Sequence, residues 1–251
     1  MSAGAAPGSG AAARAAVVVG ASSGIGRALA LRLGREGWRV GIAARRTAQL
    51  EEVRAALGPS ARAVTLDVAD PARAMALLEE LIAGLGGADL VVLCAGTGHI
   101  NPELAWGPED ETIAVNVRGF AALANVAFRH LVGRGRGHLV SISSLAALRG
   151  HGSAPAYNAS KAFVSTYMDG LRHKAARLGS PVAFTDIQPG YVDTAMAKGP
   201  HVFWAADPDE AAAQILAAVR RRARRAVVTR RWRLVAWLIR LTPDFIQRRV
   251  G

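Results

Sequence analysis

The sequence has a single cysteine, Cys94, and lacks any long run of apolar residues. One thiol cannot form an internal disulfide, which fits a protein of a reducing compartment such as the cytoplasm. The hydrophobic fraction is 51%, yet no uninterrupted stretch reaches the roughly 18 apolar residues that indicate a membrane-spanning helix. We therefore expect a large buried core and no transmembrane segment.

Acidic residues are scarce near the C-terminus. From Val219 onward the chain carries eleven arginines and one acidic residue, Asp244, whereas the remainder carries 20 basic and 18 acidic residues. Of the formal net charge of +12, the C-terminal segment therefore carries 11 − 1 = +10 and the rest of the chain 20 − 18 = +2. Such a charge allows nucleic-acid binding, but its confinement to one end of the chain argues against a nucleic acid as the partner.

The chain also lacks a linker in its interior, so we expect one folded domain over residues 14–229. Residues 1–13 are mostly Ala, Gly and Ser without apolar periodicity, and are predicted to form a disordered tail. A secretory signal is not expected, because the first apolar run leads directly into a glycine motif. Residues 230–251 are interpreted as a basic amphipathic extension.

Short apolar runs alternate with longer segments of helical periodicity. Strands this apolar are expected to be buried on both faces, as in a parallel sheet whose crossovers are helices. We predict an α/β fold: a single-domain, doubly wound Rossmann sheet of about seven parallel strands with helices on both faces. The predicted strands are residues 17–19, 40–43, 64–66, 90–93, 139–142, 182–187 and 226–229. Helices are predicted at residues 112–132 and 207–222, with Asp207 and Pro208 as N-cap and first residue of the latter.

Ligands of doubly wound sheets bind beyond the carboxyl ends of the strands. A glycine motif follows the first predicted strand there. Glycines at a strand-to-helix turn let the backbone approach a pyrophosphate, and the helix N-terminus offers unpaired N–H groups. A tight turn without a ligand is the alternative, but the position after the first strand favours a dinucleotide site. The residues predicted to bind are Gly20, Ser22, Ser23, Gly24, Ile25 and Gly26.

Two arginines, Arg45 and Arg46, follow the second predicted strand. NAD-binding versions of this arrangement have an acidic residue here for the ribose hydroxyls, and this chain has none. Guanidinium groups instead favour a 2′-phosphate through charge-assisted, potentially bidentate bonds. We predict NADP as the cofactor. The alternative is that both arginines are solvated charges at a helix start.

After the third predicted strand, Asp67 could accept a bond from the adenine amino group while Val68 packs on the ring. Asp67 or Asp70 could equally be the N-cap of the helix that begins at Pro71, a role that suits Asp70 better. Small residues after the fourth strand, Ala95 and Gly96, leave room for a cofactor. Cys94 is interpreted as a small buried apolar group.

Tyr157 and Lys161 stand four residues apart on a predicted helix and share one face. An unperturbed phenol titrates near pH ~10, so acid/base work at neutral pH needs a nearby cation that favours phenolate. Alone, the pair could be an ordinary surface contact. Ser143 and Ser144 end the fifth predicted strand and could be turn hydroxyls, and Asn116 could be a buried hydrogen-bonding residue within its apolar segment.

In this order the motifs resemble the short-chain dehydrogenase/reductase family over about residues 17–229. The resemblance covers the glycine turn, Asp67, Ala95 and Gly96, and the segment from Pro189 and Gly190 through Thr194. It also covers Asn116, Ser144, Tyr157 and Lys161. The distance of 13 residues to Tyr157 identifies Ser144, and not Ser143, as the family's serine. Val19, Leu93 and Cys94 depart from residues usual in the family, which puts scaffold hydrogen bonds in doubt more than the chemistry.

The resemblance implies an NADP(H)-dependent oxidoreductase that interconverts a carbonyl and a secondary alcohol. Ser144 would hold the substrate oxygen and Tyr157 would exchange its proton. Lys161 would grip the nicotinamide ribose and favour phenolate, so that it and Tyr157 also contact the cofactor. Asn116 would hold a water in a proton relay. The nicotinamide end would be contacted by Pro189, Gly190, Val192 and Thr194. No metal site is predicted.

The substrate is expected to be lipophilic, because residues 195–206, where the family's substrate loop would lie, contain Val202, Phe203 and Trp204. These aromatics could equally dock a helix onto the core. The family resemblance also implies a homodimer or homotetramer. The alternative function is a catalytically silent cofactor-binding sensor or scaffold, but such a protein would not require the four catalytic residues together.

The C-terminal segment combines Arg with Trp, Leu and Ile. Its apolar stretch, Leu234 to Ile239, is too short to span a bilayer but suits a helix lying on an anionic membrane surface. The alternative is a helix packed on the core or on a partner subunit. We expect a cytoplasmic protein, with peripheral binding to the inner face of a membrane as one possibility.

Overall fold

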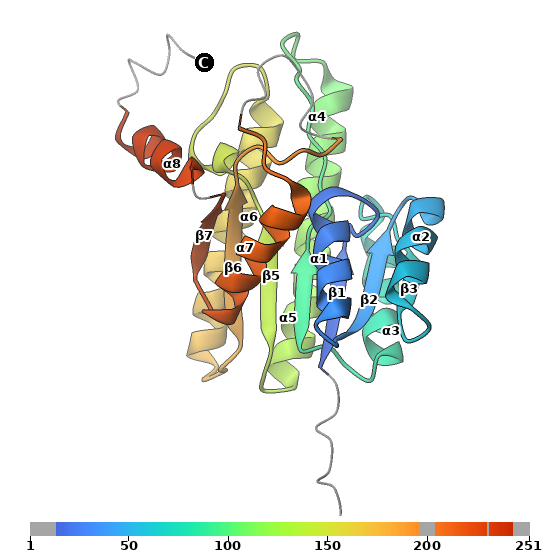
Figure 1. Cartoon of the computed structure of the whole chain (residues 1–251). Helices are drawn as coiled ribbons and strands as arrows, with labels where there is room; N and C mark the ends of the chain where they lie inside the picture. Colours follow the sequence, from blue (N-terminus) through green and yellow to red (C-terminus); the bar gives the residue numbers. More distant parts are fainter. Residues whose placement is uncertain (1–13, 196–203, 230, 243–251) are drawn as a thin grey trace, which may run out of the picture.

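The computed structural model of the chain describes residues 14–195, 204–229 and 231–242 (Figure 1). The predicted disordered tail, residues 1–13, lies outside the described residues, as do most of the predicted substrate loop and the last part of the basic extension. None of the helices in the described part of the chain is long and apolar enough to cross a membrane.

The described residues form a seven-stranded parallel sheet in the order β3-β2-β1-β4-β5-β6-β7. The predicted doubly wound fold with about seven strands is confirmed. Sequence order reverses between β1 and β4, and this reversal places a crevice beyond the carboxyl ends of the neighbouring strands. The strands are β1 (Ala15–Val19), β2 (Arg39–Ala44), β3 (Arg62–Thr65), β4 (Leu90–Leu93), β5 (His138–Ile142), β6 (Ala183–Pro189) and β7 (Arg225–Val228).

Helices cover both faces of the sheet, because the strand side chains alternate between two apolar layers. Val17 and Val19 of β1 pack in the layer beneath α3, α5 and α6, whereas Ala16 and Val18 pack in the layer beneath α1, α2 and α7. The helices are α1 (Gly24–Arg35), α2 (Thr47–Leu57), α3 (Pro71–Gly84), α4 (Trp106–Ile113), α5 (Phe120–Gly133), α6 (Pro155–Arg177), α7 (Pro208–Arg220) and α8 (Trp232–Leu241). Figure 1 shows α4 and α8 at the same end of the sheet.

Aspartate caps fix the start of two helices. Asp207 accepts bonds from the backbone N–H groups of Asp209 and Glu210, which confirms its predicted role at α7. Asp70 accepts from the N–H of Arg73 and caps α3. Of the two aspartates considered for this cap, Asp70 is the N-cap of α3. Asp67 accepts a hydrogen bond from the N–H of Ala69 in the turn that precedes α3.

The helix predicted over residues 112–132 is longer and less regular than expected. It begins at Trp106 as α4, passes through the π-helical turn Ala114–Gly119, and continues as α5. Gly119 lies so close to the backbone of Val68 that a Cβ would overlap the Val68 carbonyl oxygen. A hydrophobic pattern cannot reveal one extra residue in a turn, because the apolar stripe shifts by only part of a turn and resumes.

His138 at the start of β5 gives the fold a testable pH dependence. Its buried ring lies 2.8 Å from the Thr185 hydroxyl, and burial together with the nearby Arg222 charge lowers the pKa of His138 to about 4. An unfolded histidine titrates near ~6.5. Between about pH 6.5 and about pH 4, the unfolded chain binds a proton at this histidine and the folded chain does not. The contribution of His138 to the free energy of unfolding is therefore fully present above about pH 6.5 and declines as the pH falls toward about 4.

We expect this group alone to lower the free energy of unfolding by about 2 kcal/mol between about pH 7 and about pH 5. Urea unfolding of the wild type and of His138→Gln at both pH values measures the difference in slope. His173→Gln, at an exposed histidine, is the matched control. The same pH slope in wild type and His138→Gln would contradict the assignment.

Candidate active site

The turn after β1 is shaped by glycines. Gly20 has a φ of +89°, and a Cβ there would lie 2.5 Å from the backbone nitrogen of Ala95, while a Cβ on Gly26 would overlap the carbonyl oxygen of Gly20. Only a backbone without side chains can make these approaches. Among the described residues no side chain caps α1 at Ser23. Its first N–H groups are thus available to an anion, as expected for a pyrophosphate site.

Arg46 folds back onto this turn. Its Nη2 donates to the Ser22 hydroxyl at 3.0 Å and also to the Ser23 hydroxyl, and its Nε lies 3.3 Å from the Ser22 hydroxyl. As predicted from the sequence, Arg45 and Arg46 directly follow β2, and both are exposed. The structure thus brings Arg46 together with two of the predicted cofactor residues and leaves Arg45 beside them.

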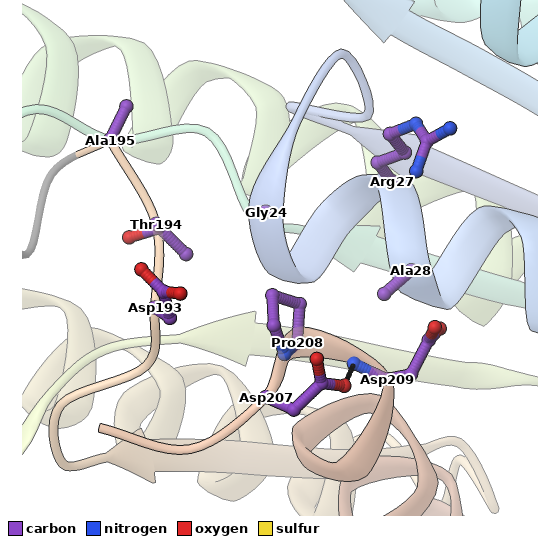
Figure 2. Close-up of a pocket in the computed structure, with 9 residues that line it drawn as sticks. All are labelled: Gly24, Arg27, Ala28, Asp193, Thr194, Ala195, Asp207, Pro208 and Asp209. Atoms are coloured by element: carbon purple, nitrogen blue, oxygen red, sulfur yellow. Dashed lines mark hydrogen bonds between the residues drawn. The ribbon is translucent and has the colours of Figure 1, made fainter. Parts of the chain in front are cut away.

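A cavity of about 430 Å³ extends from the glycine turn toward the start of α7. In Figure 2, Thr194 and Ala195 face the turn that carries Gly24, and Arg27 projects from α1. A Cβ on Gly24 would lie 2.8 Å from Thr194 Cγ2, so the segment after β6 packs closely on the turn. The lining residues are Gly24, Arg27, Ala28, Asp193, Thr194, Ala195, Asp207, Pro208 and Asp209. The predicted catalytic residues lie outside this cavity.

The other predicted cofactor residues lie at the same edge of the sheet. Asp67 is exposed after β3 and Val68 is buried next to it. Pro189 ends β6, and the Gly190 N–H donates to the carbonyl of Val228. Val192 is buried in a bridge with Ala206. Contacts of these residues with a cofactor stay predictions.

Asn116 lies inside the π-helical turn, where its buried amide makes three hydrogen bonds. Its Oδ1 accepts from the Thr97 N–H at 2.9 Å, and its Nδ2 donates to the Thr97 carbonyl at 2.7 Å and to the Ser160 hydroxyl at 3.0 Å. The amide therefore clamps the segment after β4 to α6. π-helical turns occur frequently at functional sites because they redirect one side chain.

Lys161 is buried, and its Nζ donates to the Ile142 carbonyl at 3.2 Å. A Cβ on Gly96 would lie 3.2 Å from this Nζ and 3.2 Å from Asn116 Oδ1, so both groups meet at Gly96. The Nζ lies 5.7 Å from the centre of the half-buried Tyr157 ring. That ring packs on Gly98, where a Cβ would lie 2.5 Å from it. Tyr157, Lys161 and Asn116 thus converge on the segment after β4.

The two serines that follow β5, Ser143 and Ser144, have different environments. Ser143 is buried and its hydroxyl donates to the Ile187 carbonyl at 3.0 Å, so it is used within the sheet. Ser144 is half-buried and its hydroxyl oxygen accepts from the Ala146 N–H, which leaves the hydroxyl proton for another acceptor. Within the described residues, Ser144 therefore keeps the donor that a substrate oxygen would need.

Cys94 lies close to this cluster without taking part in proton transfer. Burial raises the pKa of its thiol to about 11, and the nearby Lys161 charge opposes the rise only in part. The thiol stays protonated near neutral pH. This agrees with its interpretation as a small apolar group.

Several contacts at the site were not predicted from the sequence. Trp232 of α8 covers Gly190 so closely that a Cβ on the glycine would overlap its ring. Thr97 and Ser160 hold Asn116, and Gly98 seats Tyr157. Only the small residues at positions 96 and 98 give a sequence signal for close packing, whereas the tryptophan contact depends on tertiary structure.

Comparison with known proteins bears on this arrangement. The family model of short chain dehydrogenases matches residues 14–223. An uncharacterized oxidoreductase from Myxococcus xanthus is 44% identical over 184 residues, covering 71% of this chain and 72% of that protein. A short-chain dehydrogenase/reductase from Burkholderia phymatum in complex with NAD has a TM-score of 0.81 at 22% identity, covering 90% and 92% of the two chains. An actinorhodin polyketide ketoreductase variant with NADPH has a TM-score of 0.75 at 26% identity, covering 86% and 95%.

Proposed function

The chain belongs to the short-chain dehydrogenase/reductase family, and from this premise we propose that it is an NADP-dependent oxidoreductase that interconverts a carbonyl and a secondary alcohol. The convergence of Tyr157, Lys161 and Asn116 at Gly96 carries the proposal. A catalytically silent binding protein would need the glycine turn but not this cluster. The alternative is therefore not favoured.

The residues present fit a nicotinamide dinucleotide. Gly20 and Gly26 form a cradle that a Cβ would fill, and the N-terminus of α1 faces it without a side-chain cap from the described residues. Arg46, held at Ser22 and Ser23, supports a site for the 2′-phosphate, so we propose NADP over NAD. When bound, this cofactor supplies the hydride.

The chain's own residues would move the proton. The Ser144 hydroxyl would donate to the carbonyl oxygen of the substrate, and the Tyr157 hydroxyl would give its proton to the same oxygen as negative charge develops there. Lys161, fixed by the Ile142 carbonyl, would hold the ribose and stabilise the phenolate that remains. Asn116 would hold the water that returns a proton through the second acceptor position of its Oδ1, since the other three bonds of the amide go to Thr97 and Ser160.

The substrate is proposed to be a lipophilic ketone or aldehyde, with reduction as the direction. Exposed apolar side chains follow the carboxyl ends of β4 and β6, where a substrate would approach: Ile100, Leu104, Trp106, Tyr191 and Trp204. We further propose a cytoplasmic homodimer or homotetramer that pairs through the helices carrying Asn116 and Tyr157.

We expect purified protein to oxidise NADPH in the presence of bulky lipophilic ketones, with kcat/KM at least about 10-fold above that for small polar ketones. Absorbance of the reduced nicotinamide follows the reaction with NADPH and NADH in parallel. Equal or better use of NADH would overturn the NADP preference, and no turnover with any carbonyl or alcohol would overturn the enzyme assignment.

A further inference from the structure

The inner face of α8 is fixed to the candidate active site. Trp232 and Ala236 are buried against Leu145, the residue after Ser144. Trp232 also covers Gly190 and lies edge-on to Tyr191, with ring centres 5.4 Å apart. At the other end, Arg149 donates to the Thr242 carbonyl at 2.8 Å. Because of these contacts, α8 is joined rigidly to the segments after β5 and β6.

The outer face of α8 is apolar and exposed. Its stripe consists of Leu234, Trp237, Leu238 and Leu241, which are 64%, 57%, 49% and 60% exposed. The spacing of three, four and seven residues from the first places all four on one side of a helix. Leaving this much apolar surface in water is unfavourable, and such a patch marks a binding surface.

The stripe belongs to a wider apolar end of the molecule. In the described part of the chain every exposed large apolar residue except Leu178 lies beyond the carboxyl ends of the strands, on α8 or on the segments after β4 and β6. Figure 1 shows α4 and α8 at this same end. The candidate active site also lies at this end, beyond the carboxyl ends of β4 and β5.

The fold distributes the arginines of the C-terminal segment between the two ends of the sheet. Arg220 pairs with Glu36, and Arg224 and Arg225 pair with Asp169 near the start of β7, at the amino ends of the strands. By contrast, residues 230–242 contain four arginines and no acidic residue. Of these, Arg231 directly before α8 and Arg233 within α8 are exposed. The apolar stripe therefore lies among cations that have no acid in their own segment.

We propose that α8 anchors the protein on an anionic lipid surface, with the stripe inserted at the boundary of headgroups and acyl chains. A helix of 10 residues is too short to cross a bilayer but suits this interfacial position. The arginines select anionic lipid over zwitterionic lipid. Because α8 is fixed to the site, binding turns the mouth of the site toward the membrane. The corollary, which rests on the proposed function, is that a lipophilic carbonyl substrate enters from the lipid phase.

Vesicle flotation with the full-length protein tests the anchor. We expect binding to vesicles of phosphatidylcholine and phosphatidylglycerol at least about 10-fold stronger than to phosphatidylcholine alone, and weaker in high salt. The triple variant Leu234→Ser/Trp237→Ser/Leu238→Ser should lower the partition coefficient by more than about 50-fold. Leu178→Ser is the matched control, since Leu178 is 60% exposed at the opposite end.

Absence of wild-type binding to anionic vesicles, or equal loss in Leu178→Ser, would overturn the proposal. The proposal would also be overturned if the wild type did not bind vesicles and the triple variant formed a smaller oligomer than the wild type. The stripe would then join copies of this chain. A large drop in melting temperature of the triple variant, again without wild-type binding, would mean that the chain itself covers the stripe.

The corollary has a separate readout. For a ketone dissolved in anionic vesicles, the triple variant should show a KM at least about 10-fold higher than the wild type, with an unchanged KM for a water-soluble ketone. Equal KM values in vesicles would overturn entry from the lipid phase. Flotation needs no turnover, so failure of the enzyme assignment would leave the binding result intact.

Discussion

Replacing Tyr157 with Phe is expected to lower kcat for carbonyl reduction by about 10³-fold while leaving the Kd for NADPH within about 2-fold of its wild-type value. The reason lies in how the ring is held. Gly98 packs on the ring and Lys161 lies 5.7 Å from its centre, and neither contact involves the hydroxyl. A phenylalanine therefore keeps the packing and loses only the proton donor. Stopped-flow turnover and NADPH fluorescence titration measure the two effects separately.

Tyr167→Phe is the matched control, because Tyr167 belongs to the same helix and stacks on Phe163 with ring centres 5.3 Å apart. The same chemical change outside the site should leave kcat within about 2-fold. Near-normal turnover in Tyr157→Phe would refute the acid/base role. A parallel loss of NADPH binding would mean that the hydroxyl serves the cofactor site instead.

The fold was predictable because the sheet is buried on both faces. Strands such as β1 and β4 are continuous apolar runs, which is typical of parallel strands that helices cover on both faces. The π-helical turn around Asn116 was not predictable. At this turn Gly119 packs closely against Val68, a contact between two positions far apart in the sequence that a local pattern does not show.

The candidate site was predictable where it depends on local spacing. Tyr157 and Lys161 share a helix face, and the position of Gly20 after β1 is visible in the sequence. The choice of Ser144 over Ser143 came from family spacing, and the structure adds a physical reason: the Ser143 hydroxyl is used by the Ile187 carbonyl. Trp232 could not be assigned, because its partners Gly190 and Leu145 lie in the segments that follow β6 and β5, far from it in the sequence.

Charge was the least predictable property. The net charge summed from Val219 onward includes arginines that the fold places at opposite ends of the sheet. Arg224 and Arg225 are paired with Asp169, so they add little to a binding surface, whereas Arg231 and Arg233 are exposed at the start of α8. A net charge therefore predicts a partner only after the fold has placed each charge.

Arg46 is expected to determine the choice between the two dinucleotides. Arg46→Ala should lower kcat/KM with NADPH by about 10²-fold and change kcat/KM with NADH by less than about 3-fold, since only the former has a 2′-phosphate to lose charge-assisted bonds. The bonds to Ser22 and Ser23 hold the guanidinium in advance at the glycine turn, so little side-chain entropy is lost on binding.

Arg54→Ala is the matched control, because Arg54 is a half-buried arginine of α2, the helix that begins directly after Arg46, and pairs with Glu51 away from the turn. It should leave the ratio of the two efficiencies unchanged. Arg46→Lys separates charge from geometry: a lysine keeps the charge but cannot form the fork of bonds, so we expect it to recover less than about half of the lost free energy. An equal fall for NADPH and NADH in Arg46→Ala would instead assign this arginine to the stability of the turn, through its bonds to the two serines.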